Sequence, residues 1–67
     1  MPMYVGESGE PFEARYIMAD NIEDIANWSH SDERFIRKNK GHYARIEDGE
    51  LTITYKPYFE RKFKEVG

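Results

Sequence analysis

The chain has 67 residues and a net charge of −3, and 39% of its residues are hydrophobic, 34% charged and 15% aromatic. This length predicts a single domain over residues 1–67, and the aromatic content favours a folded core over disorder. The sequence contains no cysteine, which excludes disulfides and thiolate metal sites. No stretch approaches the roughly 18 apolar residues of a membrane span, and residues 1–6 do not resemble a secretory signal. We therefore expect a soluble, cytoplasmic protein that does not enter a membrane.

The charge is divided unevenly between the two halves of the chain. Residues 1–33 hold eight acids and one base, whereas residues 34–67 hold nine bases and five acids. The two halves therefore carry charges of −7 and +4. Such asymmetry indicates either a charged binding face or two halves that attract each other within the fold.

The first part of the chain predicts a turn-rich leader and then a strand. Residues 1–11 form either a loose leader or a short strand over residues 3–5 with a loop after it. From residue 12 the hydrophobicity alternates, and one side of the strand collects Phe12, Ala14, Tyr16 and Met18. A period of two over seven residues predicts a half-buried strand.

A short helix is predicted for residues 21–29. Asp20 is placed to cap the first N–H groups of this helix, and Glu23 is placed to reach back to the cap. Trp28 lies on the flank of a narrow stripe at helical spacing, which consists of Ile22, Ile25, Ala26 and Ser29. Residues 29–32 end the helix, with His30 at its C-terminus.

The second half of the chain predicts a short strand, a hairpin and a tail with two alternative conformations. A short strand is expected over residues 34–37, a turn over residues 38–41 and a β-hairpin over residues 42–55. Asp48 and Gly49 form the hairpin turn. The inward positions of the two arms are Ala44, Ile46, Leu51, Ile53 and Tyr55, and the solvent-side positions of the second arm are Thr52 and Thr54.

Two conformations are open for the tail, residues 57–67. Pro57 suits the first turn of a short helix that carries Phe59, Phe63 and Val66 on one face. The proline can equally break a strand and leave a mobile end. With the tail, the predicted fold is α+β: one short helix packed on a small three- to four-stranded, mainly antiparallel sheet, in β-α-β-β order with a C-terminal hairpin.

No set of residues predicts catalysis or a metal site. His30 and His42, together with Asp32 and Glu33, lack the spacing of known zinc sites. No serine lies in a nucleophile elbow, and the glycines of residues 6–9 are flanked by glutamates that would repel a phosphate. A chain this short seldom encloses a reactive cleft. We therefore expect a protein that is not an enzyme and that holds no cofactor or metal.

The segment after the first strand reads Ala19-Asp20-Asn21-Ile22-Glu23-Asp24-Ile25. Strand and segment together are similar to those of small phage and mobile-element proteins, which include inhibitors of host RNA polymerase. This resemblance covers about a quarter of the chain. It implies a phage or mobile-element origin and a role as an inhibitor or modulator of a larger protein, and it carries over no site residues.

Protein binding is the function that the sequence favours. Trp, Tyr and Arg dominate the energetics of protein interfaces, and a charged half can steer association with a partner. The expected contact residues are Trp28, Arg34, Arg37, Lys38 and Tyr58. An alternative role for Trp28 is to cover the core of so small a domain.

Two other binding modes stay open. Basic and aromatic residues alternate over residues 34–45 and 55–63, a pattern by which a hairpin face and tail can hold single-stranded nucleic acid. The pI of about 5.3 is low for such a domain. The open edges of a small sheet could also pair two copies into a homo-oligomer.

Overall fold

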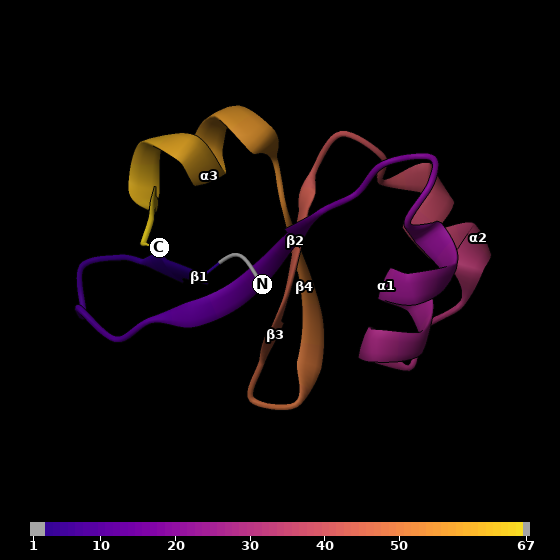
Figure 1. The fold of residues 1–67 in the computed structure, drawn as a ribbon, viewed down its shortest axis with the longest axis horizontal. Helices are drawn as coiled ribbons and strands as arrows, with labels where there is room; N and C mark the ends of the chain where they lie inside the picture. The colour runs from indigo at the N-terminus through magenta and orange to yellow at the C-terminus, as the bar shows by residue number, and fades with distance from the viewer. Residues whose placement is uncertain (1–2, 67) are drawn as a thin grey trace.

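The computed structural model describes residues 3–66, which form five strands and three helices (Figure 1). In chain order these are β1 (Met3–Val5), β2 (Phe12–Tyr16), α1 (Ile22–Ser29), α2 (Glu33–Lys38), β3 (Tyr43–Glu47), β4 (Glu50–Thr54), α3 (Lys56–Lys62) and β5 (Lys64–Glu65). Residues 1–2 and 67, at the ends of the predicted leader and tail, lie outside the described residues.

The strands form an antiparallel sheet in the order β4-β3-β2-β1-β5. This arrangement confirms the predicted α+β class, and β1 confirms the strand alternative for the leader. The predicted number of elements differs slightly from that observed, because residues 3–66 contain the unpredicted helix α2, a helix in the tail and a short fifth strand. The β-α-β-β order is wrong for the same reason.

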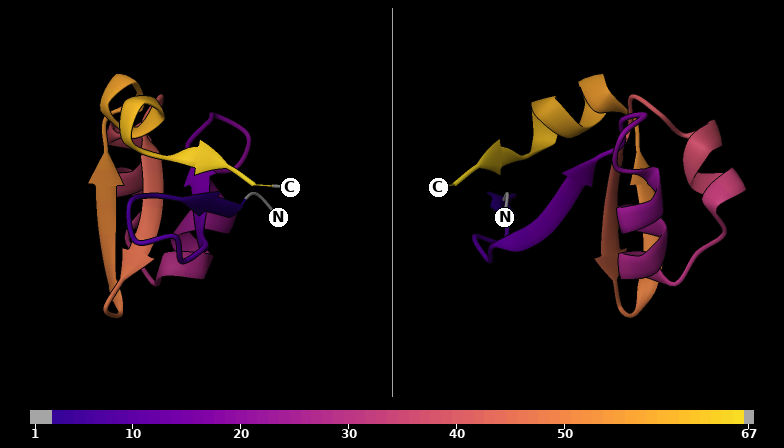
Figure 2. Two further views of the ribbon diagram at one scale, coloured as in Figure 1. Left: turned by 90° about the vertical axis from the view of Figure 1, so that its left-hand side faces the viewer. Right: turned by 45° about the vertical axis from the view of Figure 1, so that its right-hand side comes forward.

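Helices cover both faces of the sheet. Figures 1 and 2 show α1 and α2 on one side of the β3–β4 hairpin and α3 on the other side. The buried cluster beneath α1 and α2 consists of Ile17, Ile22, Ile25, Ala26, Ile36 and Ala44. The cluster beneath α3 consists of Ala14, Tyr43 and Phe59, surrounded by Tyr4, Phe12, Tyr16 and Phe63. A single helix cannot cover a sheet that carries apolar side chains on both faces, so the prediction of one helix on one face is wrong.

The predicted strand over residues 34–37 is wrong, because this segment is helix α2. Asp32 precedes the helix in an extended conformation, and its Oδ1 accepts a hydrogen bond from the backbone N–H of Arg34 at 2.8 Å. This bond also holds the pKa of the Asp32 carboxyl below its usual value. Ile36 is the one buried residue of α2. The two apolar residues of this short segment, Phe35 and Ile36, are adjacent and produce no helical stripe, so periodicity does not distinguish the segment from a strand.

Helix α1 lies where the sequence predicts it, but its start differs in detail. Asp20 does not cap the helix, because the N-cap position is occupied by Asn21. The Asn21 side chain accepts a hydrogen bond from Met18 N and donates one to Tyr16 O, each at 2.8 Å. Asn21 therefore ties the turn to the end of β2. The predicted end of the helix is confirmed, with His30 in a left-handed conformation at φ 55°.

Some side chains differ in burial from what strict alternation predicts. Met18 lies beyond the end of β2 and is 47% exposed, whereas Ile17 is buried against α1 and α2. Ile46 has the inward orientation but lies near the hairpin turn and is 39% exposed. Thr52 and Thr54 are half-buried rather than solvent-exposed.

The predicted β3–β4 hairpin is confirmed. Asp48 and Gly49 adopt φ values of 53° and 80°, which a two-residue turn of this handedness requires. The turn pairs Glu47 with Glu50 and sets the register of the two strands. Ala44 consequently faces Ile53 on the side of α1 and α2.

The tail confirms the helix alternative. Pro57 lies in the first turn of α3, and Phe59 is buried. The helix ends before Phe63, whose ring packs so close to Gly6 that a Cβ there would lie 2.7 Å from it. The chain then pairs with β1 as β5, so Val66 is 40% exposed and does not share a face with the two phenylalanines.

Tyr43 joins the sheet to α3. Its ring stacks on that of Phe59 with centroids 4.1 Å apart and planes inclined by 9°. Its hydroxyl donates a hydrogen bond to Oε2 of Glu60 at 3.1 Å. Burial, and after it the hydrogen bond to Glu60, raise the pKa of Tyr43 from 10.0 to about 12.

This shift predicts a loss of stability at alkaline pH. The protonated Tyr43 hydroxyl stabilises the fold fully below pH 10, the pKa of an exposed tyrosine, and this contribution disappears as the pH rises through about 12. The shift corresponds to a fall of up to about 3 kcal/mol in the free energy of unfolding. Urea unfolding at a series of alkaline pH values measures this fall. Tyr43→Phe lacks the ionising group and should lose distinctly less, so equal losses in the two proteins would contradict the assignment.

Candidate docking surface

A groove lies beside the C-terminal end of β4. Its lining consists of Asn39, Ile53, Thr54, Tyr55 and Tyr58, and its volume is about 490 Å³. These residues come from the end of α2, from β4 and from the start of α3. The groove therefore depends on both helices keeping their places beside the sheet.

Two tyrosines in this groove are exposed, unlike the rings packed in the core. Tyr55 is 67% exposed and Tyr58 is 50% exposed, whereas Tyr43 and Phe59 are buried. Tyr55 ends the extended segment before α3, and its ring lies 4.7 Å from that of His42. Tyr58 precedes Phe59 in α3, and because neighbouring helical residues point about 100° apart, an inward Phe59 directs Tyr58 outward.

Three lysines, Lys38, Lys40 and Lys62, neighbour lining residues of the groove, and we call them its rim. Lys62 Nζ lies 5.1 Å from the centre of the Tyr58 ring, and a hydrogen bond to the Tyr58 hydroxyl raises the pKa of Lys62 above its usual value. Lys38 and Lys40 flank Asn39 in the chain, and both are exposed. Lys38, Lys40 and Lys62 therefore give the rim a positive formal charge.

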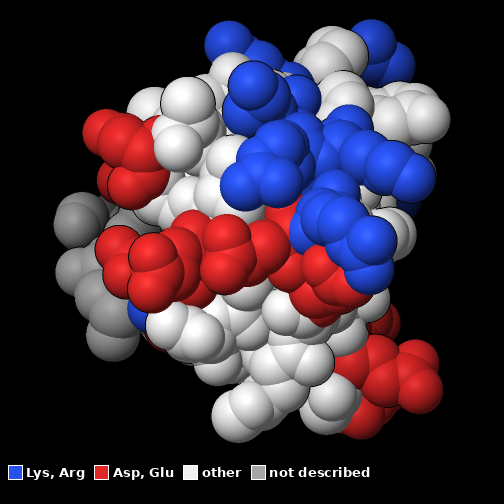
Figure 3. Space-filling model, turned by 90° about the vertical axis from the view of Figure 1, so that its right-hand side faces the viewer, with Lys and Arg blue, Asp and Glu red and all other residues white. Residues whose placement is uncertain are grey.

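The exposed face of α2 extends this positive region. Arg34 lies 3.2 Å from Asp32, and Arg37 lies 3.9 Å from Glu33. Exposed ion pairs of this kind contribute little stability and separate readily. Figure 3 shows most of the Lys and Arg side chains that are visible from this side gathered together, on the side of the molecule that α1 and α2 form, beside a band of Asp and Glu. The uneven charge of the sequence therefore becomes two neighbouring surfaces of opposite sign.

Of the five predicted contact residues, one lines the groove and three lie on α2, which ends next to the lining residue Asn39. Tyr58 lines the groove. Lys38 immediately precedes the lining residue Asn39 in the chain, and Arg34 and Arg37 lie on the same short helix as Lys38. Trp28 is placed elsewhere. It is half-buried, packs on the cluster beneath α1 and α2, and holds the Arg15 guanidinium carbon 4.3 Å from its ring centre.

Four of the five lining residues, Asn39, Ile53, Thr54 and Tyr55, were not predicted as protein contacts. Tyr55 continues the inward alternation of the second hairpin arm, but β4 ends at Thr54, so the ring leaves the core. The signal that could have identified it is Pro57, which favours a helix start and so ends the strand. Asn39 carried no signal, because its place beside β4 depends on α2 being a helix.

Fold and groove together define a small α+β domain with an exposed aromatic groove and a basic rim. Among the described residues, no helix has the length and apolar character needed to cross a membrane. Over the same residues, no three His, Asp or Glu side chains gather as a metal site. In comparisons with known proteins, no family model, no curated protein and no solved structure matches this chain.

Proposed function

We propose that this protein is a non-enzymatic binding protein that docks on a larger protein in the cytoplasm and modulates it. The groove beside β4 is the docking site. The observation that carries this proposal is the exposure of Tyr55 and Tyr58 in one groove. A domain this small needs most of its aromatic side chains for its core, so two exposed rings at one place indicate a binding role. Exposed aromatic residues that share a concave surface are typical anchors of protein interfaces.

The rim supports the same function. Lys62 lies against the Tyr58 ring, and Lys38 precedes the lining residue Asn39 at the end of α2, which also carries Arg34 and Arg37. Protein interfaces commonly combine an aromatic centre with a polar, solvated rim. Electrostatic attraction from such a rim would speed association with a negatively charged partner.

Single-stranded nucleic acid is the second candidate, because Tyr58 and Lys62 place a ring and a cation together. Other parts of the predicted nucleic-acid face are occupied by packing. The Arg45 guanidinium carbon lies 4.9 and 5.1 Å from the ring centres of Phe12 and Phe63, and Arg45 forms an ion pair with Glu47. We therefore favour a protein partner.

Capture from a lysate of the cells that make the protein tests the proposal. Wild-type protein should retain a saturable protein partner, and Tyr58→Ser should weaken that binding by about 2 kcal/mol, or about thirtyfold. Met18→Ser is the matched control, because Met18 is similarly exposed and does not line the groove. The proposal fails if no saturable partner is retained, or if the two variants bind it equally well.

A further inference from the structure

Strand β4 leaves one side of its backbone unpaired among the described residues. It lies at the end of the sheet and pairs with β3 alone. The two-residue turn makes Glu47 and Glu50 a hydrogen-bonded pair, and such pairs alternate along an antiparallel ladder. The N–H and C=O groups of Leu51 and Ile53 therefore point away from β3.

This unpaired edge continues into the groove. Ile53 and Thr54 belong both to β4 and to the groove lining, and Tyr58 and Asn39 line the groove further from the strand. An extended peptide that paired with the edge would direct every second side chain toward this lining. Main-chain hydrogen bonds and aromatic anchors would then act on the same ligand.

The charge near the groove favours an acidic ligand. Lys38 and Lys40 flank Asn39, and Lys62 lies over the Tyr58 ring. The large group of basic side chains in Figure 3 lies on the same side of the molecule as α2. Carboxylates of a bound strand would meet these cations at close range.

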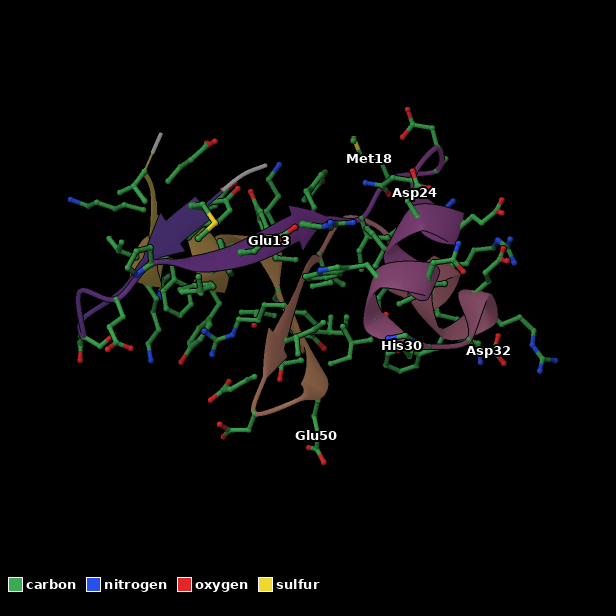
Figure 4. All side chains as sticks on the ribbon, turned by 60° about the horizontal axis from the view of Figure 1, so that its bottom comes forward. Glu13, Met18, Asp24, His30, Asp32 and Glu50 are labelled. Atoms are coloured by element: carbon green, nitrogen blue, oxygen red, sulfur yellow. The ribbon has the colours of Figure 1, made fainter. Side chains whose placement is uncertain are left out.

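The far end of β4 argues against two other occupants. The hairpin tip carries Glu47, Asp48 and Glu50, and Figure 4 shows Glu50 projecting away from the helices. A nucleic-acid strand lying along the whole edge would meet repulsion there. A second copy paired through β4 in antiparallel fashion would keep both α2 helices on one face, so their basic surfaces would repel each other.

We propose that the free edge of β4 binds an extended, acidic peptide segment of the partner protein as an added strand. This inference rests on the proposed function, because the same groove receives the partner. Leu51 and Ile53 supply the backbone hydrogen bonds, Tyr55 and Tyr58 contact the alternate side chains, and the lysines of the rim select acidic residues.

Peptide selection with the full chain as bait tests this inference. The displayed library consists of random linear peptides about ten residues long, which is enough to form one strand. The enriched peptides should carry an excess of Asp and Glu. The charge reversal Lys38→Glu combined with Lys62→Glu should remove that excess, and Met18→Ser should preserve it. When the most enriched peptide is added, hydrogen exchange of the Leu51 and Ile53 amides should slow by about tenfold or more.

Several results would overturn the added strand. The first is a set of enriched peptides without an acidic excess, and the second is unchanged exchange at Leu51 and Ile53 when the peptide is added. If oligothymidylate protects these amides better than the peptide does, the edge binds nucleic acid instead. If protection rises with protein concentration alone, the edge pairs two copies of the chain. If no peptide is enriched while capture of the partner still depends on Tyr58, the proposed function stands and the added strand is wrong. If capture is also independent of Tyr58, both are wrong.

Discussion

Replacing Phe59 with alanine is expected to unfold most of the protein at room temperature. Phe59 is 1% exposed, and its ring centre lies 4.1 Å from that of Tyr43 and 4.9 Å from those of Tyr4 and Phe63. Truncation of a buried phenylalanine costs about 3–5 kcal/mol, because transfer free energy is lost and a cavity remains. A core in a domain this short rarely supplies more than about 3–5 kcal/mol in total.

Thermal unfolding followed by circular dichroism measures this effect. Phe59→Leu is the matched control, because it keeps much of the apolar volume and should leave a folded protein with a lower melting temperature. A melting temperature of Phe59→Ala within about 5 °C of the wild type would correspond to roughly 1 kcal/mol. That result would contradict the central place of Phe59 in the cluster beneath α3.

Replacing Ile36 with alanine is expected to release α2 from the sheet. Ile36 is fully buried and is the one residue of this helix in the cluster beneath α1 and α2. Its truncation should cost about 2–5 kcal/mol. A helix of this length is not stable alone, so loss of its anchor should unwind it. Because α2 ends beside the groove, the variant should also bind the partner more weakly.

Amide hydrogen exchange distinguishes local release from general unfolding. In Ile36→Ala the amides of α2 should exchange faster by a larger factor than those of β2 and β3. Phe35→Ala is the control, because Phe35 is 48% exposed and its truncation should change stability by less than about 1 kcal/mol. Equal effects of the two substitutions on α2 would show that Ile36 does not anchor the helix.

The elements that the sequence predicted correctly are those fixed by local chemistry. Asp48 and Gly49 determine the hairpin turn, and Pro57 suits the first turn of α3. Helix α2 could not be predicted in this way, because its stability depends on the burial of Ile36 under α1. The preference of residues 34–37 for a strand or a helix is therefore decided by tertiary contacts.

The candidate site shows the same division. Lys38 and Tyr58 were predicted as contact residues from their type, whereas the groove that Tyr58 shares with Asn39 arises only when α2 and α3 both pack beside β4. Trp28 was predicted from its type too, but it is half-buried over the cluster that Ile36 completes. The exposure of an aromatic side chain depends on which face of the sheet a later helix covers, and no local pattern contains that information.

The most direct test of the docking surface is the dissociation constant of the captured partner, measured for three versions of the protein under identical conditions. Tyr55→Ser combined with Tyr58→Ser should weaken binding by more than about thirtyfold while leaving the melting temperature close to that of the wild type, and Met18→Ser should leave both unchanged. An unaltered dissociation constant in the double variant would show that the partner binds elsewhere. A large fall in its melting temperature would show instead that the two tyrosines serve the core.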